Sequence, residues 1–259
     1  MAHLEIEHHK GIATVTFDNP PLSVMTARTI QELHELLPEL EADAVRAVVL
    51  TGSGEEYFVR HFSVEELDES AQGDGPAWEV NMDDVLLRLE HLPKPVIAAL
   101  NGTALGGGLE LALATDTRVA KDGAYRFGLP EISVGILPGG GGTQRLSALL
   151  GRHKALQMMW RAQLLTPQQA LEHGLIDEMV DADTTERAVD RAQSIAAEIA
   201  ARPALAVAHI KHLARHAANP VSREMLGEES RRFAELMRTP EAKALLAAVA
   251  SDHRAERGG

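Results

Sequence analysis

The chain has 259 residues, 45% of them apolar, a formal net charge of −13 and no cysteine. This composition is typical of a globular protein with a sizeable core, and the acidic charge argues against a nucleic-acid surface. The lack of cysteine excludes disulfides and thiolate catalysis. Because we find neither an apolar run long enough to span a membrane nor a signal-peptide pattern, we expect a cytoplasmic protein with no membrane partner.

The amino-terminal third predicts alternating strands and helices. Alternation of apolar and polar residues in 4–9 and 12–17, on either side of Gly11, predicts a hairpin, and Thr26 is expected to cap a helix. The stretch 57–64 stays unassigned. Of the other segments, we expect 44–50 to be a strand and 51–54 a loop. We expect 68–76 to be a polar, mobile stretch and 78–92 a helix.

The central stretch 95–116 is where we expect the chemistry. Residues 96–100 form an apolar run of strand length, and the glycine triplet 106–108 then leads directly into a helical segment, 109–114. Glycine lets the backbone approach a ligand, and the free N–H groups of a first helical turn favour negative charge. Glu110 falls in that turn between two leucines. The pattern predicts an oxyanion-binding backbone beside a carboxylate at the edge of an apolar pocket.

A second candidate segment follows a predicted strand at 117–120. Glu131 lies in a predicted loop after an apolar patch, and the four glycines 139–142 open a helix with Thr143 near its start. Neither a Walker phosphate loop nor a dinucleotide-binding fingerprint is present. Nucleotide hydrolysis and NAD chemistry are therefore poorly supported.

The last third is mainly helical in pattern. Thr166 is expected to cap a helix, 175–180 to form a final strand and 184–202 a long amphipathic helix, with prolines separating the helices beyond. Strands alternating with helices predict an α/β protein with parallel strands. The apolar residues of the tail need a surface to pack on, either the protein's own core or a neighbouring subunit: Ile210, Leu213, Met225, Phe233, Leu236 and Met237.

Four segments in order resemble the enoyl-CoA hydratase/isomerase family, the crotonase superfamily: 99–112, 116–120, 127–131 and 135–146. Weaker similarity extends over almost the whole chain. The resemblance implies a crotonase-like spiral of repeated ββα units over 1–200 with the acyl-CoA site, and a helical trimerisation region over 201–259. It also implies a homotrimer or homohexamer, an acyl-CoA substrate that brings coenzyme A with it, and neither a permanently bound cofactor nor a metal.

By the same resemblance, Glu110 and Glu131 are the catalytic pair of an enoyl-CoA hydratase, and the backbone N–H groups of Phe62 and Gly107 hold the thioester oxygen. We assign Glu131 as the proton donor to Cα and Glu110 as the residue that orients and activates water. Two acids in one site disfavour double ionisation, so one of them keeps its proton more readily than in water. Substrate contacts are expected from Val24, Arg60, Ser63, Gly106, Pro130 and Gly139.

One loop departs from the family pattern. Where the family commonly has small-small-Gly-small-Asp, this chain has Val59-Arg60-His61-Phe62-Ser63. A backbone donor tolerates any side chain except proline, but Phe62 is expected to crowd the pocket, and Arg60 and His61 to add cations near the coenzyme A phosphates or the acyl group. The tail 239–253 also lacks the glycine and basic-aromatic pattern often seen there.

Several alternatives remain open. The same oxyanion site serves isomerases and other crotonase-type lyases and hydrolases, and a single acid suffices for double-bond isomerisation. A non-catalytic acyl-CoA-binding or RNA-binding member, or a pure assembly subunit, is the alternative from a different class, although the acidic charge speaks against RNA. Asp116 is read as structural, and the histidines as surface or packing residues because they lack metal-ligand spacing.

Overall fold

The computed structural model describes residues 3–75, 79–184, 186–217 and 223–257. Two sheets form its centre, one of six strands in the order β1-β2-β3-β5-β7-β9 and one of three in the order β4-β6-β8. Strands β1 and β2 pair antiparallel, and the other neighbouring strands of these two sheets pair parallel. The strands of the larger sheet are Leu4–His9, Ile12–Phe17, Ala47–Gly52, Val96–Leu100, Thr117–Lys121 and Glu178–Val180, and those of the smaller are Tyr57–Val59, Thr103–Leu105 and Phe127–Gly128.

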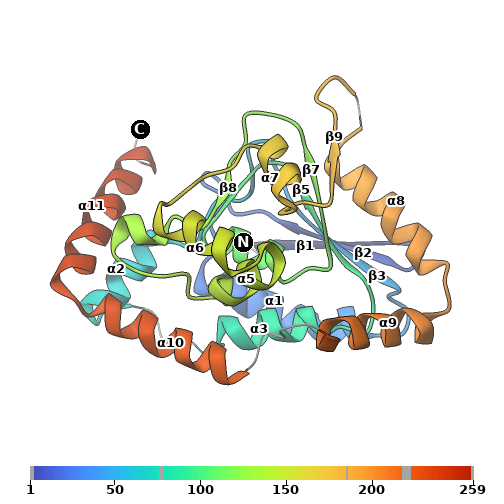
Figure 1. Ribbon diagram of the computed structural model, residues 1–259, viewed down its shortest axis with the longest axis horizontal. Helices are drawn as coiled ribbons and strands as arrows, with labels where there is room; N and C mark the ends of the chain where they lie inside the picture. Colours follow the sequence, from blue (N-terminus) through green and yellow to red (C-terminus); the bar gives the residue numbers. More distant parts are fainter. Residues whose placement is uncertain (1–2, 76–78, 185, 218–222, 258–259) are drawn as a thin grey trace.

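The two sheets arise from one repeated unit. Strands β3, β5 and β7 of the larger sheet are each followed by a strand of the smaller sheet, β4, β6 and β8, and then by helical segments. Three successive ββα units therefore wind beside one another, which confirms the α/β spiral expected from the sequence (Figure 1). The helical segments are Ala27–Glu41 (α1), Val64–Gln72 (α2), Met82–Glu90 (α3), Gly107–Leu113 (α4), Glu131–Val134 (η1), Gly142–Leu150 (α5), Arg152–Trp160 (α6), Pro167–His173 (α7), Ala188–Ala200 (α8), Ala204–Ala217 (α9), Arg223–Met237 (α10) and Pro240–Arg257 (α11).

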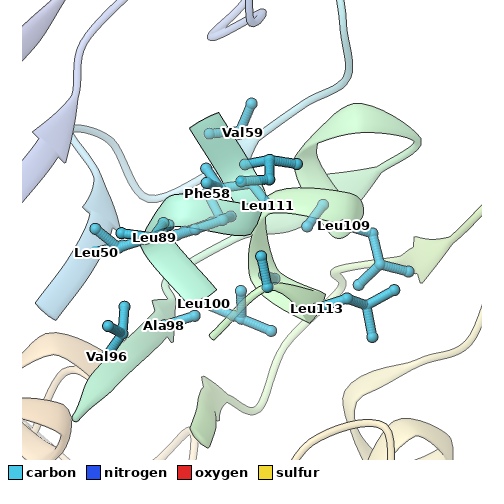
Figure 2. Packing of buried hydrophobic residues seen from close by; sticks show 14 of the residues in the cluster. Leu50, Phe58, Val59, Leu89, Val96, Ala98, Leu100, Leu109, Leu111 and Leu113 are labelled. Carbon is cyan, nitrogen blue, oxygen red and sulfur yellow. The ribbon is translucent and has the colours of Figure 1, made fainter. Parts of the chain in front are cut away.

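The central strands β3 and β5 are buried on both faces, which explains why they read as apolar runs. In β3, Ala47 and Val49 face a cluster that includes Ala192 of α8, whereas Val48 and Leu50 face the main core. In the main core, apolar side chains of α4 join those of β4 and β5 (Figure 2). The helix that begins with the glycine triplet is thus fixed by its leucines: Leu109, Leu111 and Leu113.

The local predictions were confirmed where capping and periodicity agreed. The hairpin spans the expected strands, and Thr26 and Thr166 cap α1 and α7, each in a capping box. The fourth strand of the chain, β4, and the start of α2 occupy the stretch that stayed unassigned.

Other boundaries were wrong. Residues 68–72, expected to be mobile, continue α2, because Ser63 caps that helix and Ala71 is buried against the carboxy-terminal helices; Pro76 lies outside the described residues. Strand β6 intervenes between β5 and α4, so the central strand does not pass directly into the helix. Glu131 begins the short helix η1 rather than lying in a loop.

Several other strands and helices begin or end at different residues than their patterns suggested. Strand β3 starts at Ala47 and includes Thr51 and Gly52, and α3 starts at Met82 because Asn81 caps it. Strand β9 occupies only the end of the segment predicted for it, 175–180, and helix α8 is shorter than the predicted 184–202 at both ends.

The carboxy-terminal helices differ in how far their apolar side chains are buried. Helix α11 packs on α2 and η1, and α10 on α2 and α5, along one side of the molecule (Figure 1). Their apolar residues Phe233, Leu236 and Met237 pack on the protein's own core. Ile210 and Leu213 on α9 instead stay about two-thirds exposed, at 70% and 66%. The side chain of Met225 lies outside the described residues.

Asp116 has a structural role, as expected. Its carboxylate accepts hydrogen bonds from the backbone N–H of Val96 (2.9 Å), Nζ of Lys211 (2.7 Å) and Nη2 of Arg215 (2.7 Å). The start of the central strand is therefore tied to α9. Among the described residues, no helix is long and apolar enough to cross a membrane.

Candidate active site

A cavity of about 770 Å³ lies between the ends of the smaller sheet and the carboxy-terminal helices. Glu110 of α4 and Glu131 of η1 both line it, as do Phe62 and Gly107. The four residues that the sequence singled out for chemistry thus face one common space. Its other walls are largely apolar and come from α2, η1, α10 and α11: Val64, Leu67, Ala71, Val134, Ile136, Phe233, Met237 and Leu246.

Glu110 is buried and held by the tetraglycine segment. Its Oε1 accepts hydrogen bonds from the backbone N–H groups of Gly140 and Gly142, both at 2.8 Å. The segment wraps the carboxyl so closely that a Cβ on Gly142 would lie 2.7 Å from Oε1. Burial raises the pKa of Glu110 well above its usual value, with further contributions from the charges of Glu131 and Glu229, while the two amide donors act in the opposite direction.

Glu131 has the opposite surroundings. Its own backbone amide lies nearby without hydrogen-bond geometry, and among the described residues no donor bonds to either buried carboxyl oxygen. Burial raises the pKa of Glu131 to about 8. Glu131 is therefore mainly protonated at neutral pH, whereas Glu110 has two donors that favour its ionised form. Oε1 of Glu131 lies 3.2 Å from where a Cβ on Gly106 would stand, so only glycine leaves it room.

The backbones of Phe62 and Gly107 face each other. A Cβ built on Gly107 would lie 3.4 Å from the backbone nitrogen of Phe62 and 3.2 Å from its Cβ. Gly107 is the first residue of α4, so its N–H has no partner within the helix. The loop that carries Phe62 is held in place by Met25, whose N–H donates to the carbonyl of His61 (2.8 Å) and whose carbonyl accepts from the N–H of Ser63 (2.7 Å).

The residues expected to contact substrate are not all brought together. Four of them line the cavity: Arg60, Gly106, Pro130 and Gly139. Val24 and Ser63 are buried outside its lining. The carbonyl of Val24 accepts from Nδ2 of Asn19 (2.8 Å), and Oγ of Ser63 caps α2 by accepting from the N–H of Glu66 (3.2 Å).

The unusual loop adds less charge than its sequence suggested. His61 lines the cavity and stacks on His253 of α11, with ring centroids 5.0 Å apart. Its Nδ1 bonds to the carbonyl of Phe62 at 2.7 Å, and burial lowers the pKa of His61 to about 4. The expectation that His61 supplies a cation is therefore wrong at neutral pH. Arg60 lies over the ring of Tyr57, 5.4 Å from its centroid. Phe62 lines the cavity and also belongs to the main core.

Sequence reasoning missed two acids at this site. Glu229 of α10 accepts from the N–H of Gly141 at 2.5 Å, and burial raises its pKa to about 7. Asp83 of α3 lines the cavity, accepts from Oγ of Ser230 (2.6 Å) and has a raised pKa because it is buried. Both acids occur in helices rich in charged residues, where nothing in the sequence separates a buried acid from a solvated one.

The arrangement suits proton transfer in a mainly apolar space. It offers two buried acids with raised pKa values, one of which has two amide donors, beside the closely approaching backbones of Phe62 and Gly107. Within the described ranges, no group of three or more His, Asp or Glu side chains is arranged to hold a metal ion.

Known proteins are similar to this chain over most of its length. The family model described as enoyl-CoA hydratase/isomerase matches residues 7–251. The short-chain-enoyl-CoA hydratase of Clostridium acetobutylicum is 36% identical over 253 residues, covering 97% of this chain and 95% of that protein. The fatty acid oxidation complex subunit alpha of Shewanella loihica is 44% identical over 176 residues, which cover 66% of this chain and 25% of that longer protein.

A solved structure shows the same fold over nearly its whole length. The crystal structure of an enoyl-CoA hydratase from Mycobacterium avium subsp. paratuberculosis superimposes with a TM-score of 0.83, at 25% identity, covering 95% of this chain and 98% of that one.

The buried acids predict how stability depends on pH. A carboxyl whose pKa is raised on folding keeps its proton to a higher pH in the folded than in the unfolded protein. Its contribution to the free energy of unfolding is fully present below the unfolded pKa and is lost as pH rises through the folded pKa. For Glu131 that window runs from its ordinary pKa of 4.5 to its raised pKa of about 8. We expect the free energy of unfolding, and with it the Tm, to fall between pH 5 and 8. The free energy should fall by about 1.4 kcal/mol per pH unit for each proton retained on folding, and Glu131→Gln should flatten the fall. Calorimetric scans of both proteins measure this; a Tm that rises steadily to pH 9 would contradict it.

Proposed function

Because this chain belongs to the enoyl-CoA hydratase/isomerase family, we propose that it is an enoyl-CoA hydratase that adds water across the double bond of a 2-enoyl-CoA thioester. The observation that carries the proposal is that Glu110 and Glu131 line one cavity together with Phe62 and Gly107. We further propose that the enzyme works in the cytoplasm, in fatty acid metabolism, with coenzyme A present only as part of the substrate.

The first step concerns the thioester oxygen. When a nucleophile reaches Cβ of an α,β-unsaturated thioester, negative charge develops on that oxygen. The backbone N–H groups of Phe62 and Gly107 are the donors we assign to it, supported by the 3.4 Å between the nitrogen of Phe62 and a Cβ position on Gly107. Preorganised donors of this kind contribute about 3–4 kcal/mol each to the stability of the transition state.

The second step concerns two proton transfers. We assign the ionised role to Glu110 because its two amide donors favour the carboxylate, although burial raises its pKa. Glu110 then takes a proton from water as the oxygen bonds to Cβ, and Glu131 delivers its proton to Cα. The product gains OH at Cβ and H at Cα, and one net proton has moved from Glu131 to Glu110. The pair returns to its starting state when that proton passes back, and the raised pKa of Glu131 favours recapture.

Isomerisation is the second candidate. The observation that favours it is that the carboxyl oxygens of Glu131 are buried and accept no hydrogen bond from the described residues, which leaves them free to carry a proton from one carbon to another. Glu110 distinguishes the reactions, because moving a double bond requires no activated water.

The pair of acids gives a direct test. We expect the protein to hydrate crotonyl-CoA, followed by loss of the enoyl-thioester absorbance, and Glu110→Gln and Glu131→Gln to lower kcat by about 100- to 10,000-fold each because each removes a proton-transfer group. Glu172→Gln, which changes an exposed acid on α7, is the control.

Near-normal hydration by both Gln variants would overturn the assignment. A 3-enoyl-CoA that is isomerised by the Glu110→Gln protein, in the absence of hydration by the unchanged protein, would favour the isomerase.

The carboxy-terminal region suggests an assembly. We propose that residues 201–259 serve trimerisation and that the protein is a homotrimer or homohexamer, supported by three exposed apolar side chains of α9: Leu205, Ile210 and Leu213. Light scattering after size-exclusion chromatography should give three or six times the chain mass of 28.0 kDa. Ile210→Asp should shift the mass downward, while Ser53→Asp, in an exposed loop, should not. A monomer at micromolar concentration would contradict the proposal.

A further inference from the structure

Helix α10 places a third acid behind the catalytic pair. Glu229 is only 6% exposed, although it comes from a helix near the end of the chain. Its Oε1 accepts the N–H of Gly141 at 2.5 Å, and its Oε2 accepts the hydroxyl of Thr143. Glu229 therefore reaches the segment that also holds Glu110.

The tetraglycine segment divides its amides between two carboxyls. The N–H groups of Gly140 and Gly142 donate to Glu110, and that of Gly141, between them, donates to Glu229. Gly141 has a φ of +85°, and a Cβ there would lie 2.2 Å from Nη1 of Arg145, so only glycine allows this alternation. Glu229 and Glu110 therefore bind neighbouring peptide N–H groups of the same segment.

The charges around Glu229 are mainly acidic. Glu110 of α4, Glu131 of η1 and Asp83 of α3 face it, and the charge of Glu229 contributes to the raised pKa of both Glu110 and Glu131. The nearby cation on α5 is Arg145, which is turned away: Nη2 pairs with Glu90 at 2.8 Å, and Nη1 donates to the carbonyl of Gly140 at 2.6 Å. Among the described residues, Glu229 forms no ion pair.

We propose that Glu229 is a positioning residue of this site, which holds the tetraglycine segment against Glu110 and, through its negative charge, keeps a proton on the Glu110–Glu131 pair. The role rests on the proposed hydratase function, because it concerns the proton that Glu131 delivers. It also gives α10 a part in the chemistry: the site is incomplete until the carboxy-terminal helices have packed on the core.

The pH profile of kcat/KM separates this role from a purely structural one. In the unchanged protein, activity falls at high pH as the pair loses its proton. Glu229→Gln keeps an acceptor for Gly141 but removes the charge, so the alkaline limb should move to lower pH by about half a unit to one unit. Glu235→Gln, which changes an exposed acid of the same helix, is the matched control.

A second variant and the pH dependence of the Tm test the same role of Glu229. Should Glu229→Gln fold poorly, Thr143→Val removes one donor to Glu229 and disfavours its ionised form, so the limb should move the same way by a smaller amount. Independently of activity, the fall in Tm between pH 7.5 and 9 should be smaller in Glu229→Gln, because Glu229 is already ionised there and the slope reports the pair.

The outcomes are distinct. A Glu229→Gln protein that loses activity equally at every pH, with an unmoved alkaline limb and an unchanged Tm slope above pH 7.5, would overturn the inference. An unchanged protein that hydrates no enoyl-CoA would overturn the proposed function instead, while the Tm slope would still decide whether Glu229 acts on the pair.

Discussion

The structure depends on keeping carboxyl groups inside an apolar cavity. An unpaired buried carboxylate is costly, so such a group is retained only where hydrogen bonds stabilise the charge or where the group keeps its proton. Both solutions occur here. Glu110 accepts from the amides of Gly140 and Gly142, although burial still raises its pKa, and Glu131, which has no donor among the described residues, has a pKa raised to about 8. The chemical difference between the two acids follows from this difference in surroundings.

The fold supplies these surroundings through its repeated unit. Each turn of the spiral ends in the smaller sheet before entering a helix, so β4, β6 and β8 deliver Phe62, Gly107 and Glu131 to one edge. Leucines of α4 packed in the main core fix the helix on which Glu110 lies (Figure 2). Helices α10 and α11 then line the cavity with Phe233, Met237 and Leu246.

Much of this could be predicted from sequence, because the signals were local. Capping by Thr26 and Thr166, the apolar run of β5 and the ordered glycine and glutamate motifs identified the elements, the family and the residues that share the cavity. What could not be predicted depends on contacts between distant segments. The polar composition of α2 concealed a helix that is stabilised by α11, and Glu229 meets the tetraglycine segment only after the chain has folded back.

The central claim is that two backbone amides polarise a thioester carbonyl beside this pair of acids. The most direct measurement is the carbonyl stretching frequency of a ¹³C-labelled enoyl-CoA bound to the Glu131→Gln protein, taken by difference infrared spectroscopy. The account predicts a frequency clearly below that of the same thioester in water, because preorganised donors weaken the C=O bond more than solvent does. A frequency equal to or above the value in water would contradict it.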